Sequence, residues 1–378
     1  MKSYWAFIFL FLSCFSCSHK SENKQGQHET ESKTKLKYAN GFTVKYLENA
    51  KLVEVTQPFQ EATKGYKYLL VEKGYSIPQH SDDTEVIFIP LSTIVCTSTT
   101  HIPLLDYLNV TESLVGFPTT DYISSVKARR LIDRGKITDL GIDKGMDIER
   151  IATLKPDMVM GYSVSGDLGQ FKKIDELRIP VVINAEYLEK HPLGRAEWIK
   201  FMALFYNKEK VADSVFSTIE MAYLETQKLI ANVTEKPTTM SGVVYGDTWF
   251  LPGGRNYAAK LFQDAGFTYL WLDNDSNGFL ELSFEAVYEK ASTADFWIGV
   301  ASYNSLKEIQ DADARYSKFK AFQEGNVFTY NVRKGEKGGS EFLEAGYLRP
   351  DIILKDLVKI AYPELLPGHT LYFHERLK

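Results

Sequence analysis

The chain has 378 residues, of which 44% are hydrophobic and 25% charged, an ordinary globular composition and enough length for about two domains. Its formal net charge of -5 and the absence of a Lys/Arg cluster exclude nucleic acid as the expected partner, because phosphate binding requires a basic face. Of its three cysteines only Cys96 lies outside the N-terminal segment, so once that segment is processed neither a disulfide in the fold nor a thiolate metal cluster is expected.

The N-terminus has the pattern of a processed, lipid-anchored segment. The apolar run Tyr4–Leu12 is too short to span a bilayer, and a serine then precedes Cys17 where the sequence turns polar. This arrangement resembles the lipobox of bacterial lipoproteins, so we predict a signal peptide over residues 1–17 with Cys17 as the lipidated residue. Cys14 also fits the pattern, and an ordinary secretory signal is the alternative. The polar residues 18–35 predict a disordered tether.

Residues 36–190 predict a first α/β lobe. Short antiparallel strands are expected at Phe42–Leu47, Leu52–Thr56 and Tyr66–Val71. Buried strands are then expected at Val86–Pro90 and Ile94–Cys96. The hydroxyl-rich turn 97–100 then opens a helix at about residues 101–108. Such a turn offers free N–H groups at the carboxyl edge of a sheet, where open α/β folds bind ligands, but simple N-capping explains it equally well.

A helix, turn and strand with an acidic tip follow at residues 147–161. Asp147 is a good N-cap, and Glu149 lies in the first helical turn. Lys155-Pro156-Asp157 ends the helix before a buried strand. The segment Gly161–Ser165 after the strand lacks the second glycine of a nucleophile elbow, so it does not indicate a hydrolase.

The segment Asn207–Ile230 predicts one long helix within a connecting region over residues 191–235. Its apolar positions recur three, four or seven residues apart, at Val211, Val215, Ile219, Ala222 and Leu229. Asn207 can cap its start and Pro237 lies beyond its end, so a rod of roughly 24 residues and about 35 Å is expected. Such a rod between two similar lobes limits their relative motion.

Residues 236–378 predict a second lobe that repeats the first. A glycine-rich loop with Arg255 follows its first strand and fits either a ligand loop or a tight turn. Later, Glu285 repeats the position of Glu149, because each lies two residues after a capping residue and precedes an apolar strand. A helix-dipole role explains one such glutamate, whereas duplication across the central helix indicates a shared role for both.

The run Asp147-Ile148-Glu149-Arg150-Ile151-Ala152-Thr153-Leu154-Lys155-Pro156-Asp157 resembles the periplasmic substrate-binding proteins of ABC importers for ferric siderophores, haem and cobalamin. The likeness extends over most of the chain beyond the tether. It implies an α/β fold of two Rossmann-like lobes, each with a mostly parallel central sheet, joined by one long helix with the ligand cleft between them. It also implies that Glu149 and Glu285, on the outer surfaces of the lobes, pair with arginines of the membrane permease.

The resemblance further implies a ligand site made by strand-to-helix loops that face the cleft. The corresponding aromatic, arginine and hydroxyl side chains are Thr99, Thr100, Tyr122, Tyr162, Tyr187, Tyr245, Trp249, Arg255, Trp271, Tyr303 and Arg333. Ferric chelates are often anionic, and Arg beside Tyr or Trp offers charge pairing and stacking. We therefore expect a ferric siderophore, with cobalamin and haem as alternatives, and no resident cofactor or directly bound metal. His101 is either a ligand for haem iron or simply the start of a helix.

Other classes of protein fit less well. A Zn²⁺ or Mn²⁺ receptor also uses a single connecting helix, but its site needs several converging histidines and carboxylates, and the seven histidines are scattered. An enzyme needs a nucleophile with a base or paired acids, and no such motif stands out. We expect a monomeric, non-enzymatic, membrane-anchored periplasmic protein that delivers its ligand to an inner-membrane permease dimer with its ATPase. A scavenger that serves an outer-membrane receptor is a further alternative.

Overall fold

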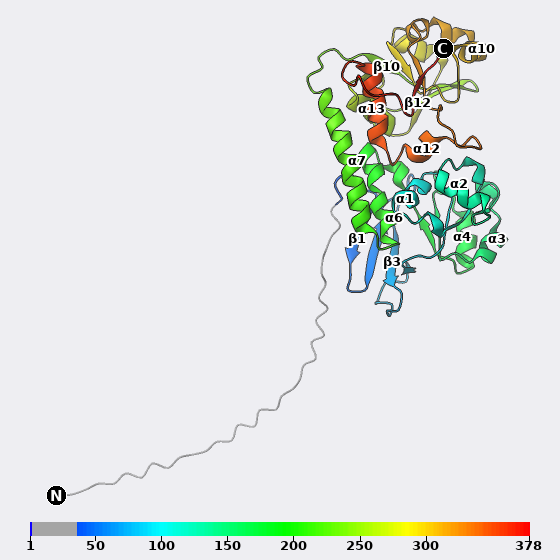
Figure 1. Ribbon diagram of the computed structural model, residues 1–378, viewed down its shortest axis with the longest axis vertical. Coiled ribbons are helices and arrows are strands. Elements are labelled where there is room, and N and C mark those ends of the chain that lie inside the picture. The colour runs from blue at the N-terminus through cyan, green and yellow to red at the C-terminus, as the bar shows by residue number, and fades with distance from the viewer. Residues whose placement is uncertain (2–35) are drawn as a thin grey trace.

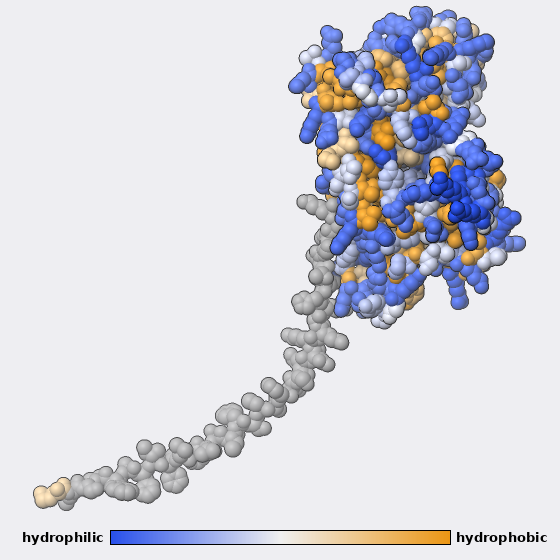
Figure 2. All heavy atoms as spheres, in the orientation of Figure 1, coloured by the Kyte–Doolittle hydropathy of each residue, from blue (hydrophilic) through white to orange (hydrophobic). Residues whose placement is uncertain are grey.

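The computed structural model describes Met1 and residues 36–378, which form two α/β lobes joined by a long helix (Figure 1). The predicted signal peptide, with Cys14 and Cys17, and the predicted tether at 18–35 lie outside the described residues. Figure 2 shows that the surface is notched between the lobes on the side opposite the long helix. Within the described residues, no helix is both long and apolar enough to cross a membrane.

A four-stranded sheet precedes the first lobe. Its strands are β1 (Phe42–Tyr46), β2 (Ala50–Val55), β3 (Tyr66–Glu72) and β4 (Thr84–Ile89). The first three are antiparallel neighbours, as predicted, while β4 runs parallel to β3 and joins the same sheet. Val53, Leu70 and Ile87 bury one face of this sheet in the main core, because side chains alternate between the two faces of a strand.

The first lobe is built on a five-stranded parallel sheet in the order β7-β6-β5-β8-β9. The strands are β5 (Ile94–Cys96), β6 (Leu114–Phe117), β7 (Thr138–Asp139), β8 (Met158–Gly161) and β9 (Val181–Ile183). The helices of this lobe are α1 (His101–Tyr107), α2 (Val126–Asp133), α3 (Ile148–Leu154) and α4 (Gly169–Glu176). The strand order reverses at β5, and in such sheets the crevice for a ligand lies at the carboxyl edge beside this point.

The second lobe repeats this plan, with the sheet order β13-β10-β15-β16-β17. The strands are β10 (Thr238–Met240), β13 (Thr268–Tyr269), β15 (Phe296–Ile298), β16 (Val327–Thr329) and the antiparallel β17 (Glu375–Arg376). A separate antiparallel sheet contains β11 (Val243–Tyr245), β12 (Thr248–Pro252) and β14 (Phe279–Leu282). The helices are α8 (Tyr257–Asp264), α9 (Phe284–Ala291), α10 (Leu306–Ala312), α11 (Lys320–Gln323), α12 (Glu341–Ala345) and α13 (Pro350–Ala361).

The rod predicted between the lobes is α7 (Glu209–Leu229). It packs against α5 (Pro192–Glu197) and α6 (Ile199–Leu204) of the connecting region and against α13 of the second lobe (Figure 1). The prediction of which residues form the buried face of this helix was partly wrong. The buried residues are Ala212, Phe216, Ile219, Tyr223 and Thr226, while Leu229 is exposed. The predicted cap was also wrong, because Asn207 has a left-handed backbone and its side chain bonds Lys51 and Glu72 instead of the helix.

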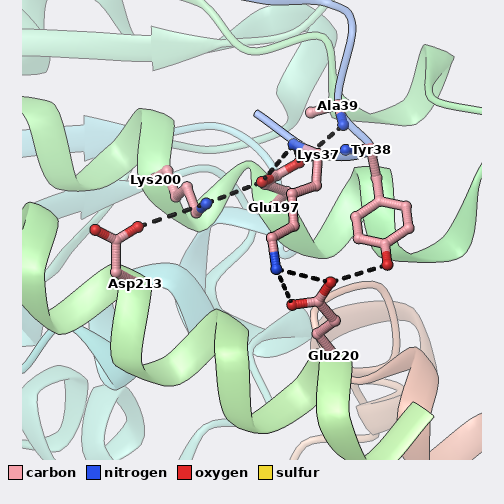
Figure 3. A network of polar contacts seen from close by, with 7 residues as sticks. All are labelled: Lys37, Tyr38, Ala39, Glu197, Lys200, Asp213 and Glu220. Atoms are coloured by element: carbon pink, nitrogen blue, oxygen red, sulfur yellow. Dashed lines mark hydrogen bonds and ion pairs between the residues drawn. The ribbon is translucent and has the colours of Figure 1, made fainter. Parts of the chain in front are cut away.

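The chain enters the described structure beside α7, where two buried or half-buried acids hold it (Figure 3). Glu197 is fully buried and accepts hydrogen bonds from the backbone N–H groups of residues 37–39 at 2.8–3.1 Å. It also accepts one from Lys200 Nζ at 2.9 Å. Glu220 of α7 accepts hydrogen bonds from Lys37 Nζ and Tyr38 OH. Residues 37–39 are thereby fixed to α5 and to the middle of the rod.

Candidate functional site

Loops at the carboxyl edge of the first lobe's sheet bring polar side chains together. The turn 97–100 follows β5, Tyr162 follows β8, and Glu186 follows β9 in the short helix η4 (Glu186–Leu188). Thr100 Oγ1 donates a hydrogen bond to Glu186 Oε1 at 2.5 Å and makes no cap bond to α1. The hydroxyl of Thr100 is therefore directed at a neighbouring loop and does not serve as a simple N-cap.

Glu186 is a buried carboxylate with one unpaired oxygen. The residue is 7% exposed, and its burial raises the pKa of the carboxyl, an effect opposed by the Thr100 hydrogen bond and by the charge of Arg195. Its Oε2 has no hydrogen-bond partner in the described part of the chain. Glu186 was not among the predicted ligand residues, although the apolar run Val181–Ile183 before it could have placed it at the end of a strand.

Arg195 joins the connecting region to the second lobe. Its guanidinium carbon lies 4.0 Å from the ring centroid of Tyr257 in α8 and 4.9 Å from that of Tyr347. Its Nε and Nη2 donate to the backbone oxygens of Glu189 and Tyr187 at 3.1 and 2.7 Å. The Tyr257 hydroxyl is buried and has no hydrogen-bond partner among the described residues. Arg195 and Tyr257 were not predicted, because their contact joins positions far apart in the sequence.

Four residues predicted for the ligand site do lie at the carboxyl edge of the first lobe. Thr99 and Thr100 are half-buried in the turn after β5. Tyr162 OH donates to Asp143 Oδ2 at 3.2 Å, and burial raises the pKa of Tyr162 to about 12. Tyr187 OH donates to the backbone oxygen of Ser163 at 2.8 Å, so its hydroxyl already has a structural role.

Three further tyrosines are spread over the surface. Tyr122 is 63% exposed in the loop after β6, and Tyr245 is 82% exposed at the end of β11. Tyr303 lines a hollow of about 330 Å³ in the second lobe, together with Glu285. Among the described residues, none of these three tyrosines forms a hydrogen bond or ring contact with Thr100, Glu186 or Arg195.

The prediction that Trp249 and Trp271 face the ligand cleft is corrected, because both side chains pack in the core of the second lobe. Trp249 of β12 is 0% exposed, and its indole N–H donates to the backbone oxygen of Ser241 at 3.1 Å. Its ring packs 5.5 Å from that of Trp297. Trp271 is also buried, with its ring 5.8 Å from that of Tyr269. An aromatic residue that follows a strand in sequence is used here to fill the core.

Both predicted arginines are already paired with acids. Arg255 Nη2 lies 2.5 Å from Asp275 Oδ1, and Arg333 Nε lies 2.8 Å from Glu341 Oε2. Arg333 also stacks on the ring of Tyr372. Neither guanidinium is therefore held ready for an anionic ligand in this arrangement.

His101 starts α1, the second of its two predicted roles. It is fully buried, and burial lowers its pKa to about 3, so the imidazole is neutral. Neither ring nitrogen has a hydrogen-bond partner in the described part of the chain. His101 is 0% exposed and so is more enclosed than Glu186 and Tyr257, which are 7% and 6% exposed.

The sequence from Ile94 to Arg333 matches the model of one protein family, described as periplasmic binding protein. This match covers more than half of the chain. The chain belongs to the periplasmic binding protein family. Its predicted two-lobe α/β architecture is confirmed, and as a family member it is the solute-binding component of an ABC importer.

Relatives and solved structures agree with this membership. Two uncharacterized lipoproteins of Methanocaldococcus jannaschii are 29% and 30% identical to this periplasmic binding protein, over 89% and 83% of this chain and 84% and 81% of theirs. The fold is similar to that of Helicobacter pylori CeuE with Ni(II) bound, with a TM-score of 0.58, 15% identity, and coverage of 75% of this chain and 88% of that one. It is also similar to the haem-binding protein RhuT from Roseiflexus sp., with a TM-score of 0.55, 16% identity, and coverage of 72% and 99%.

The duplicated units of this periplasmic binding protein are equivalent in detail. Asp157 precedes β8 and Asp295 precedes β15, and each of these strands pairs with the first strand of its own lobe's sheet. Asp157 N–H donates to Thr93 Oγ1 at 3.0 Å, and Asp295 N–H donates to Thr238 Oγ1 at the same distance. Each aspartate accepts a hydrogen bond from the backbone N–H of that same threonine.

Glu149 and Glu285 occupy matching positions in these units. Each lies in the first turn of its helix, after an N-cap that Asp147 or Ser283 provides. Both glutamates are exposed, but they differ in their neighbours. Arg315 Nη1 lies 3.1 Å from Glu285 Oε1, whereas Glu149 forms no ion pair within the described ranges. The two acids are therefore available at the surface of both lobes, and one of them has a cation beside it.

Proposed function

We propose that this periplasmic binding protein captures a ferric siderophore between its lobes and delivers it to an inner-membrane permease. The observation that carries the proposal is the junction of Glu186, Arg195 and Tyr257. There the first lobe, the connecting region and the second lobe each contribute a polar side chain. Two buried atoms at this junction, Glu186 Oε2 and Tyr257 OH, lack a partner among the described residues, and buried polar groups in native proteins are normally hydrogen-bonded.

Ligand delivery would use the two exposed glutamates. Glu149 and Glu285 stand at the same point of a duplicated unit, which favours a two-point contact with the paired subunits of a permease. Charge complementarity of this kind fixes the register and speeds the encounter of two proteins. The names of the lipoprotein relatives support an anchor, which we place at Cys17.

Haem and cobalamin are the alternative ligands. Neighbours of similar fold carry names that mention iron, haem or Ni(II), so the fold itself accommodates several metal-containing ligands. The burial of His101 favours a preformed chelate over haem that is held through this histidine.

Titration of the purified protein tests the proposal. Ferric catecholates, ferric hydroxamates, haem and cobalamin are added in turn, and tryptophan fluorescence reports binding. We expect a ferric chelate to bind with a Kd below about 10 μM, or roughly −7 kcal/mol. Tight binding of haem or cobalamin alone would replace the siderophore as ligand, and binding of none of the four would refute the proposal.

A further inference from the structure

Two opposite charges lie near each other at the junction without forming an ion pair. Arg195 Nη2 donates a 2.7 Å hydrogen bond to the backbone oxygen of Tyr187, the residue next to Glu186, yet no carboxylate of the described residues lies within ion-pair distance of Arg195. Arg195 is held by backbone oxygens and by two tyrosine rings, and Glu186 by the Thr100 hydroxyl. Both side chains are therefore held in place by neutral groups, and neither forms an ion pair with an oppositely charged side chain of the described residues.

The same junction contains two buried polar atoms without a hydrogen-bond partner among the described residues. Glu186 Oε2 can accept a hydrogen bond, and Tyr257 OH can donate or accept one. A buried carboxylate oxygen without a donor is unfavourable, so a ligand that supplies a donor gains affinity there. A half-buried guanidinium without an acid offers the complementary gain to a carboxylate.

These two charges discriminate between ligand classes. A purely anionic chelate that approaches Arg195 would be repelled by the carboxylate of Glu186. A purely cationic chelate that approaches Glu186 would be repelled by the guanidinium of Arg195. The two arginines predicted for an anionic ligand, Arg255 and Arg333, instead form ion pairs with Asp275 and Glu341. A group that carries both an ammonium and a carboxylate satisfies the two charges together.

We propose that the junction binds an amino-acid-type group of the ligand, with its ammonium at Glu186 and its carboxylate at Arg195. Tyr257 OH then hydrogen-bonds the same group from the second lobe. This inference rests on the proposed function and narrows it to ferric chelates whose organic part ends in a free ammonium and a free carboxylate. Because the site draws on both lobes and the connecting region, such a ligand would also hold the lobes together.

The test compares two ferric complexes on the full chain. One is the ferric complex of a linear tripeptide of hydroxamate-bearing ornithines with free ends, and the other is the same complex with its amino end acetylated and its carboxyl end amidated. We expect the free form to bind at least about tenfold more tightly, the equivalent of about 1.4 kcal/mol. Equal affinity of the two forms would overturn the inference.

A variant pair assigns the effect to Glu186. Glu186→Gln should remove most of the preference for the free form, while Glu85→Gln should keep it, because Glu85 is a half-buried carboxylate of β4 that lines a different hollow. A preference that survives Glu186→Gln in a protein that melts as the wild type does would contradict the assignment. If other ferric chelates bind but the two ends make no difference, the proposed function stands without this inference. If no ferric chelate binds, both the proposed function and this inference are refuted.

Discussion

The backbone N–H of Ser124 donates a 2.6 Å hydrogen bond to Glu344 Oε2 and thereby joins the first lobe to α12 of the second. The chain on both sides of α12 strengthens this contact. A Cβ at Gly339 would collide with the backbone oxygen of Tyr122, so close approach requires glycine there. Arg349 Nη1 also donates to Tyr107 OH at 2.8 Å across the lobes. One side of the space between the lobes is therefore closed by a defined set of contacts.

The first prediction concerns the acid in this contact. Burial raises the pKa of Glu344 to about 7, an effect opposed by its hydrogen bonds from Ser124 and Ser125 and reinforced by the nearby charge of Asp106. The folded protein thus holds this proton more tightly than the unfolded chain, so the stabilisation is complete below about pH 4.5 and is lost as the pH rises through about 7. Relative to Glu344→Gln, the wild type should lose on the order of 3 kcal/mol of unfolding free energy over this range.

Urea unfolding at about pH 5 and pH 8 measures this difference. Glu364→Gln is the matched control, because Glu364 is exposed beyond α13. The control should follow the pH dependence of the wild type. Identical profiles for the wild type and Glu344→Gln would show that this carboxyl titrates normally.

The second prediction concerns the attachment of residues 37–39. Replacing fully buried Glu197 with Ala leaves three backbone N–H groups without an acceptor, and it leaves the Lys200 ammonium with only Asp213, 3.5 Å away, as its ion-pair partner. Loss of one member of a buried charged network costs about 3–5 kcal/mol, and amide exchange at residues 37–39 should accelerate. Glu225→Ala on the exposed side of α7 should leave both measurements near wild type. Unchanged exchange in Glu197→Ala would mean that other contacts hold the segment.

The third prediction concerns docking. Glu149→Lys and Glu285→Lys should each reduce uptake of the ligand by about tenfold or more while the affinity of the purified protein for ligand is unchanged, because charge reversal opposes a permease arginine. Glu289→Lys tests whether any added charge on α9 suffices, since Glu289 is exposed in the same helix. Uptake that is insensitive to both reversals would favour a scavenger that does not meet this permease.

The fourth prediction concerns the rod. Because α7 runs unbroken from Glu209 to Leu229 and packs on helices of the connecting region and of the second lobe, we expect the lobes to tilt only slightly about it. Small-angle scattering should therefore show only a small change in radius of gyration when ligand is added. A large compaction would mean that α7 bends or breaks on binding.

Local patterns in the sequence predicted the elements of this fold that depend on near neighbours. The caps Asp147 and Ser283 are formed as expected, since each side chain reaches an N–H only three residues away. The burial of Trp249 and the pairing of Arg255 could not be predicted, because they depend on which strand lies opposite and which loop lies alongside. Arg195 and Tyr257 are separated by the whole of α7, so tertiary packing alone brings them into contact.

The position of the bound iron tests the central claim most directly. A crystal of the protein with the ferric chelate that binds most tightly, measured on both sides of the iron absorption edge, locates the metal by its anomalous signal. We predict one strong peak between the lobes, with side chains of both lobes around the chelate and Glu186 in contact with it. A peak in the hollow beside Glu285, or in the hollow beside Glu85, would contradict capture between the lobes.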